Sequence, residues 1–519
     1  MIQRATRPSA TLKAVQLFCH ILAIGSAFCG FAIAQLPFFY GDSVEVQQNA
    51  TTQKAKPQFA TPEEMEQAIT ESKKAFGQEG DNGKVSTDPD DLHDHGFSEN
   101  DHHPGMKHSV VVYPESTEDV VEIVKIATKY RAPIIAYSGA TRYHATGGIC
   151  VDMMNMDGII AIHVCQPGAR WMDINETLKE QGIPLFFPID PAPGATIGGM
   201  LSTGCSGTNA VRYGTAKGEW FLNATVVLPS GEVIKTRRRS RKSSAGFDTT
   251  KLVIGAEGTL VIVTEVTNRL TPVLPTTVAV VHFPNVQKAT EAVMDVMQAG
   301  VGIQCVELVD DVFISAINKY GISTSASVSS SSKPTPYPER DSLFFKFQGP
   351  TPSSLAESAS ITRRIVERHG GEGFRLARDE NEAEALWDDR KSAYYAGLAL
   401  VEGAKGWPTD VCRHLAVGHV GDGNFHALIL FRTEEEMKVA KELVSRMVRR
   451  AIELDGTCTG EHGVGMGKKL YLVEELGEGT IGLMKSIKNT LDPLGIFNPG
   501  KLYPDDEPSA RNAKEEWKS

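Results

Sequence analysis

The sequence has few cysteines for its length and no paired cysteine motif. Its eight cysteines include no CxxC, and their spacing resembles neither a zinc knuckle nor a disulfide framework. No GxGxxG opens a strand–helix–strand unit and no GxxxxGK[ST] occurs, which argues against a Rossmann dinucleotide site and a P-loop nucleotide site. We therefore expect free thiols in a reducing compartment and a cofactor site of another kind.

Positive charge is also scarce. Lys and Arg total 53 against 64 Asp and Glu, which gives a net charge of -11. A chain this acidic has no general attraction for nucleic acid, so we expect no nucleic-acid partner. The one basic run, residues 237–242, lies between two strand-like segments and is predicted to be a solvated loop.

The first 40 residues contain no acid. Arg4, Arg7 and Lys13 precede the first acid, Asp42, and residues 14–34 are almost wholly apolar. As a helix this segment would be roughly 30 Å long, enough to cross a bilayer. We predict that residues 1–40 form a mitochondrial presequence with a transmembrane segment in the inner membrane. A secretory signal remains the alternative, because small residues end the apolar run.

The remaining chain is long enough for two or three domains. Polar residues 41–105 are predicted to form a linker and a helical approach segment. Alternating strand-like and helix-like segments define a first domain, residues 106–273, and a second, residues 274–503. Residues 504–519 are predicted to be a disordered tail.

Residues 191–214, PAPGATIGGMLSTGCSGTNAVRYG, contain six glycines and five Ser or Thr. This composition would make a poor helix or strand. It would make a good backbone cradle, because glycine lets main-chain N–H groups approach phosphate oxygens and the small hydroxyls add neutral donors. A flexible loop is the alternative, but the apolar residues and flanking strand-like segments argue against it.

Together with IGAEGTLVIVTE at residues 254–265, this stretch resembles the FAD domain of the vanillyl-alcohol-oxidase type (PCMH-type) over residues 106–273. The resemblance implies an α+β fold, with a two-subdomain FAD-binding domain followed by an α+β substrate domain that has an antiparallel sheet. It implies FAD as the cofactor, lined by Ser138, Gly139, Ala140, Thr141, Pro193, Gly194, Thr196, Gly198, Gly199, Ser202, Thr203, Ser206, Gly207, Tyr213, Gly214, Glu257, Gly258, Thr259, Ile262 and Asn498.

A second motif pair is GHVGDGNFH at residues 418–426 and GEHGVG at residues 460–465. Two histidines and a carboxylate bracketed by glycines suit a divalent first-row metal, zinc or manganese, with an open coordination position. From the spacing alone, structural histidines remain an equally good interpretation.

These motifs, with LWDDRKSAYY (386–395), WPTDV (407–411) and LDPLGIFNPGK (491–501), resemble the C-terminal half of D-lactate and D-2-hydroxyglutarate dehydrogenases, above all the cytochrome-linked mitochondrial type. The resemblance implies that His419, His426 and Glu461 bind the metal. It implies that Arg390 clamps the substrate carboxylate and that His462 is the base. The implied reaction is FAD-dependent oxidation of D-lactate to pyruvate, with electrons passed to cytochrome c. Without the resemblance, Arg390 would be interpreted as a surface helix charge.

The chain is shorter than that family at residues 138–148, 160–166 and 410–419. The first gap shortens the phosphate loop and would remove backbone donors to FAD. A non-catalytic remnant that keeps the fold therefore stays open. An enzyme for a glycerol-ether lipid or for D-2-hydroxyglutarate also stays open. The second carboxylate of D-2-hydroxyglutarate would need an extra cation near Arg390, and Lys391 is the only adjacent candidate.

Overall fold

The computed structural model describes residues 57–77, 83–97, 106–138, 147–320, 336–412 and 418–505. The predicted presequence and transmembrane segment lie outside these residues, as do residues 506–519 of the predicted tail. Gly139, Ala140 and Thr141 of the predicted FAD site also lie outside them. Among the helices that are described, none is long and apolar enough to cross a membrane. The six cysteines found in the described ranges form no disulfide, and five of them are buried.

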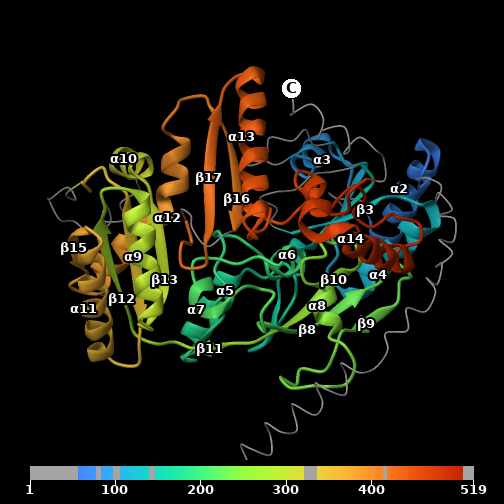
Figure 1. The fold of residues 1–519 in the computed structure, drawn as a ribbon. Helices are drawn as coiled ribbons and strands as arrows, with labels where there is room; N and C mark the ends of the chain where they lie inside the picture. The colour runs from blue at the N-terminus through green and yellow to red at the C-terminus, as the bar shows by residue number, and fades with distance from the viewer. Residues whose placement is uncertain are drawn as a thin grey trace, which may run out of the picture. The chain divides into compact units, whose positions relative to one another are not determined.

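The first sheet holds the N-terminal core (Figure 1). Its order is β1-β2-β4-β3, in which β2, β4 and β3 are parallel and β1 pairs with β2 antiparallel. Ser116 begins α4, since its side chain accepts from Asp119 N. The bounds are α2 Pro62–Phe76, β1 Val85–Ser86, α3 Pro89–Asp94, β2 Val110–Val112, α4 Thr117–Tyr130, β3 Ile134–Tyr137 and β4 Ile149–Asp152. Part of the predicted linker therefore contributes a strand and an apolar helix face to this core.

The second sheet has the order β5-β6-β10-β8-β9 and is antiparallel. Its strands β8 and β9 confirm the hairpin predicted around residues 229–231. The basic run at 237–242 follows β9, and apart from Arg237 its residues are exposed, as predicted. The bounds are β5 Ile159–Ala161, β6 Val164–Cys165, α5 Trp171–Glu180, β7 Leu185–Phe186, β8 Phe221–Val227, β9 Val233–Lys235, α8 Thr249–Val253, β10 Ile262–Asn268 and β11 Thr271–Pro272.

The glycine-rich stretch is not wholly irregular, which corrects the sequence interpretation. It contains two short helices, α6 Ile197–Thr203 and α7 Ala210–Tyr213. Thr196 caps α6 by accepting from Gly199 N, and Gly204 ends it in the left-handed region with φ 66°. Buried apolar residues of α6 join the core of the second sheet, and this packing outweighs the weak helix propensity of the glycines.

The third sheet, order β13-β14-β12-β15, is antiparallel as predicted. Side chains of β12 alternate between two cores, one under α9 and α11 and one under α10 and α12. The bounds are β12 Thr276–His282, α9 Val286–Gln298, β13 Ile303–Val309, α10 Asp311–Tyr320, β14 Ser342–Gln348, α11 Pro352–Arg368, β15 Glu372–Leu376 and α12 Glu380–Leu398.

A two-stranded sheet, β16-β17, follows (Figure 1). The first histidine motif ends on β17 with Asn424, Phe425 and His426, and the second, residues 460–465, follows α13. Helix α13 packs beside it in a core that also includes Cys458, Tyr471 and Ile481. The bounds are β16 Lys405–Cys412, β17 Asn424–Phe431, α13 Glu434–Glu453, the 3-10 helix η3 Lys469–Tyr471 and α14 Leu472–Leu491.

The buried pair of His95 and Asp152 predicts a pH-dependent stability. His95 Nε2 lies 2.8 Å from Asp152 Oδ2, and Nδ1 lies 3.0 Å from Asp91 Oδ1. Burial lowers the pKa of His95, but the two carboxylates outweigh it and the pKa is raised. Because the folded pKa is the higher one, this stabilisation is complete below the unfolded value of about 6.5 and is lost as pH rises through the folded pKa.

We expect His95→Gln to lower the free energy of unfolding by about 1.5–3 kcal/mol near pH 6, the range for a hydrogen bond to a charged group. The difference from the unsubstituted chain should shrink as pH is raised toward about 9. Urea unfolding of both chains at several pH values measures it. A difference that stays constant with pH would contradict the assignment.

Candidate functional site

Two predicted FAD-binding segments meet at the end of β3. Ser138 Oγ lies 2.7 Å from Thr196 Oγ1, so the last described residue of the phosphate strand touches the start of the glycine-rich stretch. Gly194, beside it, has φ +87°, and a Cβ added there or at Gly214 would meet nothing within 4 Å. Main chain that faces open space next to two hydroxyl groups fits a phosphate-bearing cofactor.

Other glycines of the stretch serve close packing. A Cβ on Gly198 would lie 2.6 Å from Pro167 Cβ, and one on Gly207 would lie 2.4 Å from the carbonyl carbon of Asp190. Glycine is required there because two backbones pass without room for a side chain.

Two predicted cofactor residues direct their side chains elsewhere. Ile262 is 2% exposed and packs in the core of the first sheet. Tyr213 Oη donates to Gln348 Oε1 at 2.6 Å, and its carbonyl accepts from Trp220 Nε1. A contribution of either residue to FAD binding would therefore come from its backbone.

The predicted metal ligands lie together. His419, His426 and Glu461 offer one ligand atom each, and these three atoms lie within 4.8 Å of one another. Glu461 Oε1 lies 3.3 Å from His419 Nε2 and 3.1 Å from His426 Nε2. Two imidazoles and one carboxylate that converge in this way match the donor set of a zinc or manganese site with an open position.

Opposite charges explain how this buried cluster is tolerated. Burial alone would lower the pKa of His419, but Glu307 and Glu461 raise it well above its usual value. Burial alone would raise the pKa of Glu461, but His419 and His426 hold it well below its usual value. The carboxylates are therefore ionised at neutral pH and can bind a cation.

Asp410, on β16, holds the loop that carries Glu461. Its Oδ2 accepts from Gly460 N and Glu461 N, each at 2.7 Å, and from His462 N at 3.3 Å. Its Oδ1 lies 2.9 Å from Lys468 Nζ and 3.1 Å from His462 Nδ1. Burial opposes ionisation of Asp410, yet His462 and Lys468 keep its pKa well below the usual value.

Asp410 lies where its carboxylate prepares the His462 ring to accept a proton. A carboxylate only accepts hydrogen bonds, so it favours the tautomer with the hydrogen on Nδ1. The other ring nitrogen, Nε2, lies 3.9 Å from Glu461 Oε1, on the side of the metal ligands. A base at this position would lie beside a hydroxyl group bound by a cation at the predicted ligands.

Glu257, from the first half of the chain, binds the other end of the same loop. Its Oε1 accepts from Val464 N at 2.6 Å and its Oε2 from Gly465 N at 2.8 Å. Its carbonyl oxygen accepts from Asn498 Nδ2. Glu257 and Asn498, both predicted to line FAD, have positive φ angles of 52° and 42°. Loop 460–465 is therefore bound from two sides.

Ser206 connects the predicted FAD stretch to the predicted metal site. Its Oγ donates to Glu461 Oε2 at 2.8 Å, and Ser206 is 5% exposed. A ligand seated on the glycine-rich stretch would therefore lie beside the histidine cluster.

Arg390, on α12, is not a surface charge. Its side chain is 16% exposed, and Nη2 lies 2.5 Å from Glu307 Oε2. Its Nε is buried without a hydrogen-bond partner among the described residues. A buried N–H donor without a protein acceptor fits the predicted role of binding a substrate carboxylate.

Sequence reasoning missed two buried residues of the site. Glu307 lies on β13, whose residues are all buried. The signal available in the sequence was a single acid among apolar residues, in VELV at residues 306–309. Asn424 lies inside the second motif, 4% exposed, and neither side-chain amide atom has a partner in the described part of the chain. Its Oδ1 would lie 2.2 Å from a Cβ on Gly460, which explains the glycine before Glu461.

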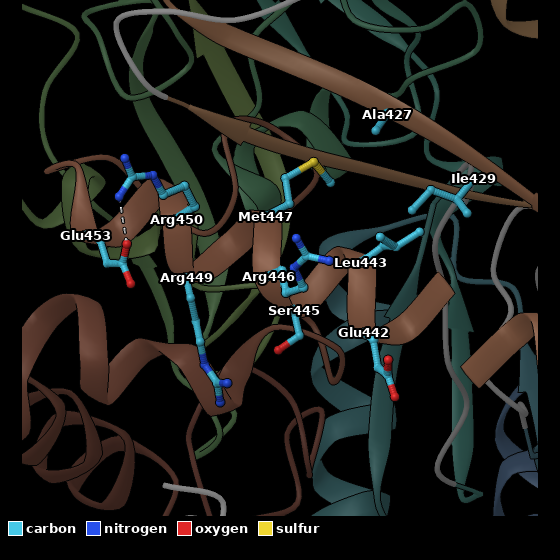
Figure 2. Close-up of a pocket in the computed structure, with 10 residues that line it drawn as sticks. All are labelled: Ala427, Ile429, Glu442, Leu443, Ser445, Arg446, Met447, Arg449, Arg450 and Glu453. Atoms are coloured by element: carbon cyan, nitrogen blue, oxygen red, sulfur yellow. Dashed lines mark hydrogen bonds and ion pairs between the residues drawn. The ribbon is translucent and has the colours of Figure 1, made fainter. Parts of the chain in front are cut away.

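A groove of about 620 Å³ lies between β17 and α13 (Figure 2). Ala427 and Ile429 line one side, and α13 lines the other with Leu443, Met447 and charged residues. The groove contains no histidine, cysteine or buried acid, so we place the chemistry at the histidine cluster instead.

Comparisons with known proteins identify both halves of the chain. Residues 108–237 match the family described as FAD binding domain, and residues 275–416 and 410–502 match FAD linked oxidases, C-terminal domain. D-lactate dehydrogenase [cytochrome], mitochondrial, from Arabidopsis thaliana is 41% identical, over 81% of this chain and 78% of the plant protein. The chain belongs to this family of FAD-linked dehydrogenases. D-lactate dehydrogenase [cytochrome] 1, mitochondrial, from Saccharomyces cerevisiae is 35% identical, over 86% of this chain and 81% of its own length.

A solved structure agrees with the fold. The 4-ethylphenol oxidase from Gulosibacter chungangensis superposes with a TM-score of 0.67 at 19% identity, covering 86% of this chain and 99% of that one. This confirms the predicted α+β fold of the vanillyl-alcohol-oxidase type.

Proposed function

We propose that the chain oxidises D-lactate to pyruvate with FAD and a divalent cation, and passes the electrons to cytochrome c. The observation that carries the proposal is the 2.8 Å contact between Ser206 Oγ and Glu461 Oε2, which joins the glycine-rich stretch to the metal ligands. The names of the relatives from Arabidopsis thaliana and Saccharomyces cerevisiae support the substrate and the acceptor. They also support a mitochondrial location. The apolar run at residues 14–34 is the basis for proposing an inner-membrane tether.

Each protein group has a distinct role in this reaction. Arg390 binds the lactate carboxylate through the part of its guanidinium group that does not contact Glu307. His419, His426 and Glu461 hold the cation, zinc or manganese, at the substrate hydroxyl. His462 accepts the hydroxyl proton, with Asp410 fixing its ring. When bound, the cation lowers the hydroxyl pKa and FAD accepts the hydride from C2.

Flavin reduction tests the proposal. We expect purified chain to carry FAD whose absorbance is bleached by D-lactate and not by L-lactate, and then restored by oxidised cytochrome c. Dialysis against a chelator should lower turnover, since the cation no longer acidifies the hydroxyl, and zinc or manganese should restore it.

Three outcomes would contradict the proposal. A chain that stays colourless with added FAD would favour the non-catalytic remnant suggested by the short phosphate loop. Faster bleaching by D-2-hydroxyglutarate would favour the larger substrate. Turnover that is unaffected by the chelator, with no metal in the protein, would exclude the cation.

A further inference from the structure

Glu307 is a buried acid that the proposed reaction does not use. It lies on β13, where all seven residues are buried, and its own exposure is 0%. An ionised carboxylate in such a position needs a partner for each oxygen. Oε2 lies 2.5 Å from Arg390 Nη2, and Oε1 lies 2.8 Å from His419 Nδ1. One carboxylate therefore joins the predicted substrate clamp to a predicted metal ligand.

The contact with His419 fixes which nitrogen faces the cation. Glu307 can only accept, so the hydrogen of the neutral ring lies on Nδ1 and the lone pair on Nε2. Nε2 is the nitrogen that lies 3.3 Å from Glu461 Oε1, and the ring centroid lies 4.9 Å from that of His426. Without Glu307 the ring could rotate or adopt the other tautomer.

The contact with Arg390 fixes the guanidinium plane. Arginine presents its N–H donors in a rigid fork, so holding Nη2 also sets the direction of Nε. Nε is buried and has no partner among the residues that the structure describes. Glu307 therefore leaves one defined donor of Arg390 for a carboxylate ligand.

We infer that Glu307 is a positioning residue that couples substrate binding to metal binding, by orienting Arg390 and His419 with the two oxygens of one carboxylate. This inference rests on the proposed function, because it takes Arg390 and His419 in the roles given there. In this inference, Glu307 itself contacts neither the substrate nor the cation.

Glu307→Gln tests the inference at nearly constant volume. The amide keeps one acceptor and turns an NH₂ group toward the other donor, so only one partner can stay in place. We expect the affinity for Mn²⁺ or Zn²⁺ to fall about 10–100-fold, as when a partner of a ligand histidine is lost. We expect the KM for D-lactate to rise roughly tenfold or more, the effect of one charge-assisted hydrogen bond.

The measurement uses the full chain loaded with FAD and stripped of metal. Titration calorimetry with MnCl₂ or ZnCl₂ alone gives the affinity, and kinetics at saturating metal separate kcat from KM. Excess metal should restore kcat and leave KM raised, a split that general destabilisation does not produce.

Asp389→Asn is the matched control. Asp389 neighbours Arg390 on α12 and its Oδ2 accepts from Tyr337 Oη at 2.7 Å, away from the histidines. We expect its metal affinity to equal that of the unsubstituted chain. If Glu307→Gln does not fold, Glu307→Gln with Arg390→Gln removes the unpaired guanidinium, and its metal affinity is compared with that of Arg390→Gln alone.

Unchanged metal affinity in Glu307→Gln, or equal losses in Asp389→Asn, would overturn the inference while the proposed function stands. An unsubstituted chain that binds no metal would instead refute the metal site, and this inference with it.

Discussion

Replacing His462 by glutamine is expected to lower kcat for D-lactate by about 10²–10⁴-fold, the usual contribution of a positioned base. The ring nitrogen that faces the metal ligands accepts the hydroxyl proton, and the amide nitrogen of glutamine cannot. FAD content and metal affinity should be retained, because His462 is not among the three converging ligands. Steady-state kinetics with flavin and metal analysis on the same preparation measure all three.

His163→Gln provides the control for this substitution. His163 is exposed in the turn between β5 and β6, and its backbone carbonyl accepts from Asn268 N. We expect its kcat to match that of the unsubstituted chain. A His462→Gln variant within a few-fold of full activity would remove His462 from the proton transfer.

Replacing Asp410 by asparagine is expected to lower the free energy of unfolding by about 3–5 kcal/mol, the range for breaking a buried ion pair. Asp410 is 0% exposed, and its carboxylate is the partner of Lys468, whose side chain is 12% exposed. The asparagine leaves the ammonium group buried without a counter-charge and turns an NH₂ group toward backbone donors. Urea unfolding measures the loss.

Two further variants make this test specific. Asp505→Asn removes a neighbouring but exposed pair with Lys469, and we expect a loss of about 1 kcal/mol or less. Asp410→Asn with Lys468→Met removes the stranded charge and should recover part of the loss. A loss below about 1 kcal/mol for Asp410→Asn alone would mean that Lys468 finds another partner.

The sequence predicted the fold, and it predicted which two histidines and which glutamate lie together, because both depend on local motifs. Glycines bracket His419, His426 and Glu461, and the structure brings these three side chains together. The hairpin at residues 229–231 was likewise readable from its turn residues, and the antiparallel sheet of the second half followed from the family resemblance.

What could not be read depends on contacts between distant segments. Helix α6 forms in a stretch rich in glycine because tertiary packing overrides propensity. Glu307 is 83 residues from Arg390 and 112 from His419, and no local pattern links them. In the sequence, Arg390 resembles a surface charge because its neighbours are charged. Only the structure shows that β13 places Glu307 against it.

Because loop 460–465 is attached at both ends, partial unfolding of either half of the chain would disturb the candidate site. Asp410 holds residues 460–462 and Glu257 holds residues 464 and 465, and these acids belong to opposite halves of the polypeptide. Melting of either half withdraws one acceptor and frees the segment that carries Glu461. A cation bound at the proposed site would therefore report on the integrity of both halves, and its release would accompany partial denaturation of either one.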